Sequence, residues 1–372
     1  MRYLTLDVET TTGNGGDPFD GMNQLIAIGW YNSDGLGDVL RPVFKDYIQN
    51  LVDTHDMIIG CNLKFDLHWL KRLGINFEGK KLYDIQVADY ILSHQKNTFS
   101  SLNSIAERLL GEKKLDVVND QYWSQGIDTD KIPWDTLYEY CLQDCRLTFQ
   151  CAMKQMELTP KYQHTIMSIA MQDLAVLQEM EWAGLRFDRD QASVEADKAM
   201  KEKEEIIATL KGNTKVPESF NWSSPKQLSA LLFGGKVTLS ERVPDGTWKS
   251  GKRQGMVKFK TVDTTYVFPR LLTPIKGTET KTQGVFSTDE DHLTKLGKHG
   301  MVADILRIRA IEKLIGTYLQ KLPAMQDEHN WGKQYIHGQF SQTTTATGRL
   351  ASSRPNLQNF PPEANRLIIS RY

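Results

Sequence analysis

Acidic side chains near the start of the chain have a spacing that could bind metal ions. Asp7 and Glu9 lie two residues apart within residues 2–11, a stretch rich in β-forming residues that runs into a Thr- and Gly-rich loop. Residues two apart on a strand point to the same face, so the two carboxylates repel each other. This repulsion is costly inside a fold unless a cation lies between the groups. The pair therefore predicts a cation site.

Two further acidic residues follow polar residues at helical spacing. Asp66 lies four residues after Asn62, and Asp144 lies four residues after Tyr140. With the first pair they make four hard oxygen donors, a set that suits two divalent cations about 4 Å apart with open positions for water and a phosphate. Tyr140, one helical turn before Asp144, is placed to orient an attacking water. Each signal is weak alone, and their order within one domain makes the set specific.

The elements that must position these side chains form an α/β pattern. Three strands joined by short turns come first, and strands and helices alternate after them. The predicted elements are strands over 2–11, 23–31 and 37–43, a helix over 44–52, a strand over 57–60, a helix over 63–73, and strand and helix segments within 82–93 and 99–110. We therefore predict an α/β domain with a mixed sheet.

The helix predicted over residues 133–156 has two different faces. Its apolar residues at core spacing are Tyr138, Leu142, Cys145, Phe149, Ala152 and Met156. At about 100° per residue, Tyr140 and Asp144 lie on nearly the opposite face. They therefore face either water or a second buried surface such as a cleft.

Composition limits the classes of protein. The chain has 372 residues, of which 40% are hydrophobic, enough for two or more domains. Its 45 basic and 46 acidic side chains give a net charge of -1, so composition alone predicts neither nucleic acid nor membrane as a partner. There is no apolar run of ~18 residues and no leader-like start, so we expect a cytoplasmic protein.

The cysteines are too few and too irregularly spaced for a disulfide framework. They are Cys61, Cys141, Cys145 and Cys151. A zinc site from the last three is an alternative, but no Cys-x-x-Cys pair or nearby His completes its ligand set. Buried thiols are therefore favoured.

Three short motifs resemble those of a known superfamily. Residues 6–10 (LDVET), 62–66 (NLKFD) and 140–144 (YCLQD) are similar to the three motifs of the DEDD superfamily of 3′-5′ exonucleases, in its tyrosine-containing branch. The resemblance implies an RNase H-like fold, two Mg²⁺ or Mn²⁺ ions, and hydrolysis that releases nucleoside 5′-monophosphates.

The same resemblance implies a role for each matching residue. The implied metal ligands are Asp7, Glu9, Asp66 and Asp144, with Asp7 bridging to a second metal near Asp66. Tyr140 is expected to position the attacking water. Thr10 and Asn62 are candidates to touch the terminal nucleotides, and Asp84 is expected to support the site rather than bind metal.

The rest of the chain resembles family A DNA polymerases of the phage type. Residues 220–228, 286–290 and 318–323 are similar to successive thumb segments. Residues 345–359 (TATGRLASSRPNLQN) are similar to the stretch that holds the primer-template duplex. DNA is therefore the expected partner, both as a single-stranded 3′ end and as a primer-template duplex.

Four side chains of the last stretch are expected to contact DNA. Arg349 and Arg354 can bind phosphates or minor-groove acceptors, and Asn356 and Gln358 can supply hydrogen bonds that do not depend on base sequence. An ordinary polar loop is the simpler interpretation, which a match of this length disfavours.

Residues 234–285 read as a β-hairpin insertion rich in Gly, Thr, Lys and Pro. Basic residues outnumber acidic ones between positions 236 and 260; they are Lys236, Arg242, Lys249, Lys252, Arg253, Lys258 and Lys260, against Glu241 and Asp245. This balance suits a tip that follows phosphates, and a solvated loop kept soluble by lysines is the alternative. The insertion follows residues 223–227, whereas the thioredoxin-binding insert of some phage polymerases precedes the matching segment, so thioredoxin is not predicted as a partner.

We expect three regions: an exonuclease domain over 1–158, a thumb-like helical region over 159–335 with the insertion at about 234–285, and the start of a palm over 336–372. The strand that bears the first polymerase aspartate in the family would come after residue 372. We therefore expect no polymerisation by this chain alone, with a second chain that bears palm and fingers completing a split polymerase. A truncated or interrupted gene is the alternative.

The predicted function is a metal-dependent 3′-5′ DNA exonuclease that proofreads for a polymerase, in the host cytoplasm if a phage encodes it. One alternative is an RNA-trimming exonuclease of the same branch. Another is a non-catalytic DNA-binding subunit with a silent nuclease site.

Overall fold

The computed structural model describes residues 1–114, 116–297 and 299–370, and these form two compact units. One unit joins Met1–Arg189 with Leu322–Tyr372, and the other is Asp190–Lys321. These limits differ from the predicted regions because helix α7 (His164–Ala183), which follows the predicted boundary at 158, packs against α2 and β5 of the first unit. The ranges of the predicted regions stay a prediction.

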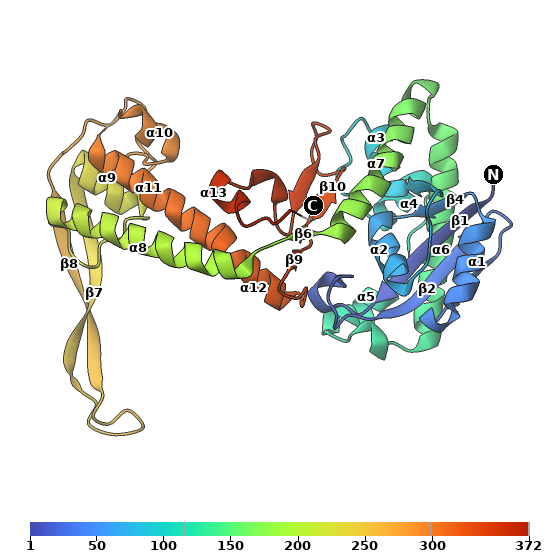
Figure 1. The fold of residues 1–372 in the computed structure, drawn as a ribbon, viewed down its shortest axis with the longest axis horizontal. Coiled ribbons are helices and arrows are strands. Elements are labelled where there is room, and N and C mark those ends of the chain that lie inside the picture. Colours follow the sequence, from blue (N-terminus) through green and yellow to red (C-terminus); the bar gives the residue numbers. More distant parts are fainter. Residues whose placement is uncertain (115, 298, 371–372) are drawn as a thin grey trace. The chain divides into compact units, whose positions relative to one another are not determined.

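A five-stranded mixed sheet lies at the centre of the first unit (Figure 1). Its strands, in spatial order, are β3 (Gly37–Leu40), β2 (Leu25–Asn32), β1 (Tyr3–Thr10), β4 (Met57–Gly60) and β5 (Lys81–Asp84). The first three strands pair antiparallel, and β1, β4 and β5 pair parallel. The predicted mixed α/β fold is confirmed, and β1 is its central strand.

Helices cover both faces of this sheet. They are α1 (Lys45–Thr54), α2 (Leu63–Leu73), α3 (Ile85–Leu92), α4 (Leu102–Leu110), α5 (Val117–Gln121), α6 (Trp134–Leu158) and α7. Leu4 and Leu6 of β1 lie in the main core with Ile48 of α1, which sets one face of the sheet. The alternate residues of β1 point to the other face, where α6 crosses β1 and β2.

The end of the described chain is part of the first unit. Its elements are α12 (Lys321–Glu328), β9 (Tyr335–Ile336), β10 (Gln339–Ser341), β11 (Ala351–Ser353) and α13 (Pro362–Asn365), and β9 pairs with β6 (Leu185–Arg186). A buried carboxylate ties this segment to the exonuclease-like sheet and helices. Glu181 accepts hydrogen bonds from Lys64 Nζ at 2.5 Å, His68 Nε2 at 2.8 Å and the backbone N–H of Phe340 at 2.6 Å. These charge-assisted bonds lower the pKa of Glu181 despite its burial.

The second unit is helical with one long hairpin. Its elements are α8 (Arg189–Thr214), α9 (Pro225–Phe233), β7 (Gly235–Thr247), β8 (Val257–Phe268), α10 (Glu290–Lys295), α11 (Gly300–Leu314) and a π-helical turn (Ile315–Leu319). Ser224 caps α9 as its sequence indicates, and Pro225 occupies the first turn. The core joins Leu228 of α9, Leu293 of α10 and Ile305 of α11. The predicted hairpin is present, because β7 and β8 pair antiparallel.

Within the described residues, none of the helices combines the length and the apolar character that crossing a membrane requires.

Candidate active site

Strand β1 presents Asp7 and Glu9 on the face that α6 covers. Asp7 lies opposite Gly29 of β2 and Glu9 lies opposite Ala27. A Cβ at position 29 would lie only 2.5 Å from Cys141 Sγ of α6. The absence of a side chain at Gly29 therefore lets α6 approach the sheet directly beside Asp7.

Helix α6 brings Tyr140 and Asp144 to these two carboxylates. Tyr140 is 4% exposed and Asp144 is 5% exposed, so they face a second buried surface and not water. The single apolar stripe predicted for this helix is wrong in part, because Tyr138 and Leu142 are only half-buried while Leu137 and Cys141 are buried. The helix is covered on both sides, so no one stripe describes its core face.

Asp66 reaches the site from the first turn of α2. Strand β4 ends at Gly60, so the Val8 N–H on that side of β1 has no strand partner and donates to Asp66 Oδ1 at 3.0 Å. Asp66 is 3% exposed. The fold therefore brings together all five residues that the sequence predicts as catalytic, and their roles as metal ligands stay a prediction.

Burial and the charges of neighbouring carboxylates raise the pKa values of Asp7, Glu9 and Asp66, and burial raises that of Asp144. Burial, and then the charge of Asp144, raise the pKa of Asp7 to about 7. Burial and the charges of Asp7 and Asp144 raise the pKa of Glu9 well above its ordinary value. Burial and Asp7 do the same for the pKa of Asp66. Charged carboxylates that lie close together and are largely excluded from water need cations beside them.

A lysine that the sequence analysis did not select supplies one of these cations. Lys114, between α4 and α5, donates to Asp144 Oδ2 at 2.7 Å and to Tyr140 Oη at 2.6 Å. Its position in an irregular segment gives no periodicity that could have identified it. Gly29 did have a signal, because an isolated glycine inside a strand pattern indicates a close approach of another backbone or helix.

The donor atoms fit hard divalent cations such as Mg²⁺ or Mn²⁺ better than Zn²⁺. Asp144 Oδ1 is buried and has no hydrogen-bond partner among the described residues, so one carboxylate oxygen is free for a ligand. The thiols of Cys141 and Cys145 lie within 4.8 Å of an Asp7 carboxylate oxygen, whereas Cys151 lies in the main core. The set proposed for zinc is therefore not assembled, and four acidic residues with a free oxygen suit the harder ions.

Asn62 and Thr10 flank the acidic residues at the same end of the sheet. Asn62 begins α2 with a left-handed backbone (φ 59°), which asparagine tolerates, and its side chain is exposed. It lines a pocket of about 240 Å³ together with Phe65 and Gln342. Thr10 is buried at the end of β1, and its hydroxyl donates to the Thr11 carbonyl at 3.1 Å. Asn62 is therefore the more accessible of the two candidates.

Asp84 lies beside the site and bonds to backbone N–H groups, and its expected supporting role stays a prediction. It caps α3 and accepts hydrogen bonds from the N–H of Leu63 at 2.8 Å and of Gln86 at 2.8 Å. Its oxygens therefore tie the starts of α2 and α3 together and fix the backbone at Asn62, whose N–H also donates to Asp84 at 3.3 Å.

The four predicted DNA contacts of residues 349–358 divide into two kinds. Arg349 and Arg354 are exposed, and their guanidinium groups form no ion pair with the described residues. Asn356 Oδ1 accepts from the Gln358 N–H at 3.0 Å, and Gln358 Nε2 donates to the Leu350 carbonyl at 3.1 Å. The arginines are therefore free to bind phosphates, while the two amide side chains stabilise the loop.

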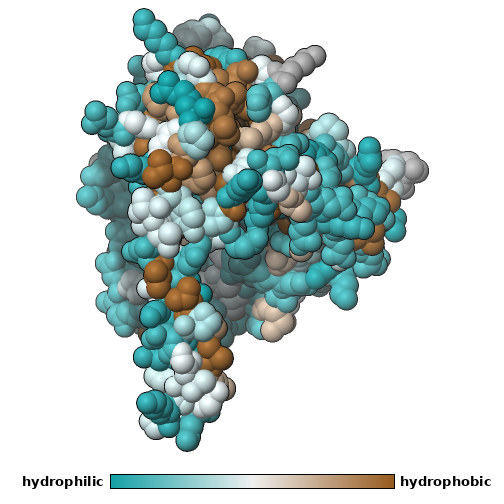
Figure 2. Space-filling model, turned by 90° about the vertical axis from the view of Figure 1, so that its left-hand side faces the viewer, coloured by the Kyte–Doolittle hydropathy of each residue, from teal (hydrophilic) through white to brown (hydrophobic). Residues whose placement is uncertain are grey.

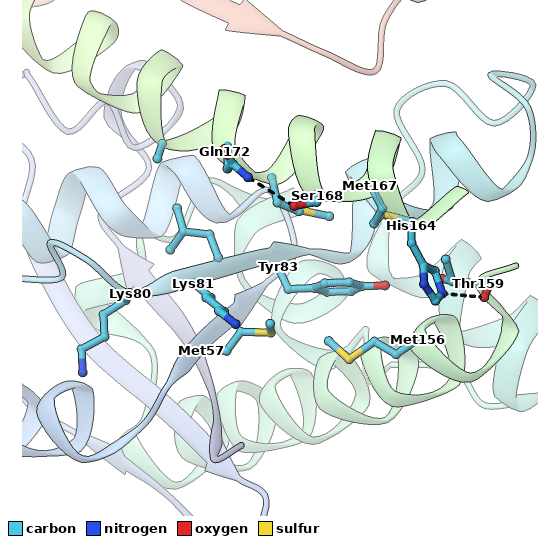
Figure 3. Close-up of a pocket in the computed structure, with 13 residues that line it drawn as sticks. Met57, Lys80, Lys81, Tyr83, Met156, Thr159, His164, Met167, Ser168 and Gln172 are labelled. Atoms are coloured by element: carbon cyan, nitrogen blue, oxygen red, sulfur yellow. Dashed lines mark hydrogen bonds between the residues drawn. The ribbon is translucent and has the colours of Figure 1, made fainter. Parts of the chain in front are cut away.

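A second pocket, of about 560 Å³, lies between β5 and α7. Figure 3 shows Tyr83 extending into it between Met156 and Met167. None of its described lining residues is acidic, and the buried Tyr83 hydroxyl has no partner among the described residues. This pocket therefore lacks the donors of a metal-dependent nuclease.

Comparisons with known proteins match two parts of the chain to protein families. The sequence model of a family described as 3′-5′ exonuclease matches residues 2–159, which contain the sheet and all four acidic residues. The first unit therefore carries a 3′-5′ exonuclease domain, as predicted. The model of DNA polymerase family A matches residues 261–371. Residues 261–371 are therefore similar to part of DNA polymerase family A.

Relatives with this architecture include bacterial and phage polymerases. DNA polymerase I of Synechocystis sp. is 31% identical over 310 residues, which cover 81% of this chain and 26% of that protein. The DNA polymerase of Escherichia phage T5 is 27% identical, over 87% of this chain and 36% of that protein. The chain thus spans only a quarter to about a third of these relatives.

A solved structure has the same fold. The POL domain of Pol1 from M. smegmatis, in a complex with DNA primer-template and dNTP, has a TM-score of 0.66 and 19% sequence identity over 99% of this chain and 54% of that one.

Proposed function

We propose that the chain is a metal-dependent 3′-5′ DNA exonuclease that proofreads for a polymerase. The observation that carries the proposal is the convergence of four acidic residues from three separate elements. Strand β1 contributes Asp7 and Glu9, α2 contributes Asp66 and α6 contributes Asp144. All of them except Asp7 are buried. No purely structural need accounts for four acidic residues whose pKa values are all raised, three of them by the charge of another member of the set.

The residues present divide the work of phosphodiester hydrolysis between them. Asp7, Glu9 and Asp144 would hold one Mg²⁺ or Mn²⁺ ion, and Asp7 with Asp66 a second. Such ions lower the pKa of water and stabilise the attacking and leaving oxygens of an in-line displacement. The Tyr140 hydroxyl would orient the attacking water. Its ring is held edge-on to Trp123 with centroids 5.8 Å apart, and this contact fixes the position of the hydroxyl.

The substrate end is proposed to lie over the pocket at Asn62. The exposed amide of Asn62 and the ring of Phe65 supply a hydrogen-bonding group and a stacking surface, which suit an unpaired terminal nucleotide. Arg349 and Arg354 would hold the phosphates of the duplex.

The β7–β8 hairpin is proposed as a further DNA contact. Lys249, Lys252 and Arg253 at its tip form no ion pair with the described residues. Trp248 is 40% exposed and Phe259 is 47% exposed. Figure 2 shows apolar side chains among hydrophilic ones along the hairpin, which extends downward in that view. Free cations beside exposed rings suit a polyanion whose bases can stack.

The polymerase-family segment is proposed to hold the primer-template duplex for a palm and fingers. A second chain is one source for them, and primer extension on mixing with a palm-bearing chain tests that form. The ranges 1–158, 159–335 and 336–372 for exonuclease, thumb and palm start, and a cytoplasmic location, belong to the same proposal.

Degradation of 5′-labelled single strands tests the substrate and the direction. With Mg²⁺, we expect a ladder that shortens from the 3′ end of DNA and disappears with EDTA. Faster trimming of RNA of the same sequence would favour the RNA alternative, and no cleavage together with no Mn²⁺ binding would favour the non-catalytic one.

A further inference from the structure

The ammonium group of Lys114 lies inside the acidic site. It donates to Asp144 Oδ2 at 2.7 Å and to Tyr140 Oη at 2.6 Å, and it lies 4.5 Å from the centre of the Tyr140 ring. The side chain is 20% exposed, so these bonds are only weakly screened by water. One cation therefore binds the water-orienting residue and a metal ligand at the same time.

A lysine side chain carries a positive charge at neutral pH, and the ion pair with Asp144 places this charge within the acidic site. The positive charge thus acts on the same acidic residues that a divalent cation would bind. Asp144 Oδ1, in contrast, is buried and has no partner among the described residues.

We propose that Lys114 is a built-in counter-cation that stabilises the acidic site without metal and weakens its affinity for divalent ions. This inference rests on the proposed function, because it concerns ions bound by the same carboxylates. A fixed positive charge beside Asp144 offsets the repulsion among the acidic residues. The same charge repels an arriving cation, and it takes one of the two Asp144 oxygens.

The proposal predicts two effects of opposite sign when the charge is removed. In Lys114→Met the protein without metal should be less stable, because Asp144 becomes an unpaired buried charge. The same variant should bind Mn²⁺ more tightly, by at least about fivefold, since a unit charge a few Å away opposes binding even in a water-like medium. A lysine that only packs or braces the loop would give the first effect without the second.

The experiment measures Mn²⁺ affinity by calorimetry on the full chain, with no DNA present, and thermal stability in EDTA. Lys113→Met is the matched control, because Lys113 precedes Lys114, has a side chain 66% exposed and pairs with Glu107 at 3.2 Å. It should leave both quantities unchanged. Lys114→Arg keeps the charge and should bind Mn²⁺ within about twofold of the wild type.

Equal Mn²⁺ affinity of the wild type and Lys114→Met would overturn the proposal, and so would weaker binding by Lys114→Met. The proposed nuclease function would survive that result, because the wild type would still bind the ion. A wild type that binds no Mn²⁺ would overturn both. Should Lys114→Met not fold, Lys114→Gln carries the same loss of charge and the same expectation.

Discussion

Gly29 lies directly opposite Asp7 in the antiparallel ladder of β1 and β2, and α6 packs onto it without an intervening side chain. A Cβ at this position would lie 2.5 Å from Cys141 Sγ and 2.7 Å from Cys145 Sγ. Helix α6 carries both Tyr140 and Asp144. The contact at Gly29 therefore controls how near these two residues come to Asp7.

Adding one methyl group at Gly29 should move the helix and weaken the site. In Gly29→Ala, α6 must shift, at a cost of about 1–3 kcal/mol typical of an overpacked core. We expect exonuclease activity to fall at least about tenfold, since a displacement of 1 Å at a catalytic group can cost ~10²-fold. Kinetics with single-stranded DNA and urea unfolding measure the two effects.

Gly212 provides the control for this substitution. A Cβ at Gly212 would meet no atom within 4 Å, and the residue lies in helix α8 of the other unit. Gly212→Ala should keep full activity and gain slight stability from the higher helix propensity of alanine. Equal activity of Gly29→Ala and the wild type would show that the close contact does not position the site.

Without metal, the protein should lose stability as the pH rises. The folded-state pKa of Asp7 is about 7, above that of an unfolded aspartate, because of burial and Asp144. Between about pH 4 and pH 7 the folded state binds the proton and the unfolded state does not, so the free energy of unfolding falls as the pH rises. Melting curves in EDTA from pH 5 to pH 8 should show this decline.

The substitution Asp7→Asn should make the decline of stability with pH less steep, since the amide does not titrate. Mn²⁺ should oppose it in the wild type at pH 8, because an ion that binds only the folded state stabilises it. A wild type that melts at the same temperature from pH 5 to pH 8 in EDTA would contradict the raised pKa of Asp7.

The Tyr140 hydroxyl should matter for the rate and not for folding. Tyr140→Phe keeps the ring against Trp123 and removes the oxygen that accepts a hydrogen bond from Lys114 and is proposed to orient the attacking water. We expect kcat to fall roughly 10²-fold, the scale of a group that handles protons or water in the transition state. Tyr138→Phe is the control on the same helix, because its hydroxyl bonds Asp38 at 2.8 Å instead. Similar kinetics for both variants would argue against the role of Tyr140.

The hairpin tip should contribute to DNA affinity in a salt-dependent way. Replacing Lys249, Lys252 and Arg253 together by Ala should weaken binding of primer-template DNA and reduce the slope of log affinity against log salt by up to ~3. The control variant has three exposed lysines elsewhere in the second unit replaced by Ala, so it loses the same charge; they are Lys201, Lys295 and Lys313. If both triple variants lose the same affinity, the hairpin has no special role.

The sequence predicted the elements whose chemistry is local. The alternation in residues 2–11 predicted β1, and the i, i+4 spacing of Asn62 and Asp66 correctly placed Asp66 in the first turn of α2, with Asn62 as the residue before the helix. The helix carrying Asp144 was also predicted, but a single periodicity could not show that α6 is buried on both sides.

Contacts between distant segments could not be predicted in the same way. Lys114 reaches Asp144 because an irregular segment folds back onto the site. The sequence has no periodic pattern that predicts the path of this segment. Gly29 matters only because α6 lies against it. The hydrogen bonds of Asn356 and Gln358 within their own loop likewise depend on the backbone path, and the DNA contacts expected of these two side chains stay a prediction.

The most direct test of the proposed metal-dependent hydrolysis is the activity of a protein with Asp7→Ala and Glu9→Ala together. These changes remove two of the four carboxylates and leave in place the arginines that are proposed to contact DNA. We predict that Mg²⁺-dependent removal of nucleotides from the 3′ end of single-stranded DNA is lost, while the variant stays folded and still binds the DNA. Degradation at the wild-type rate would contradict the proposal.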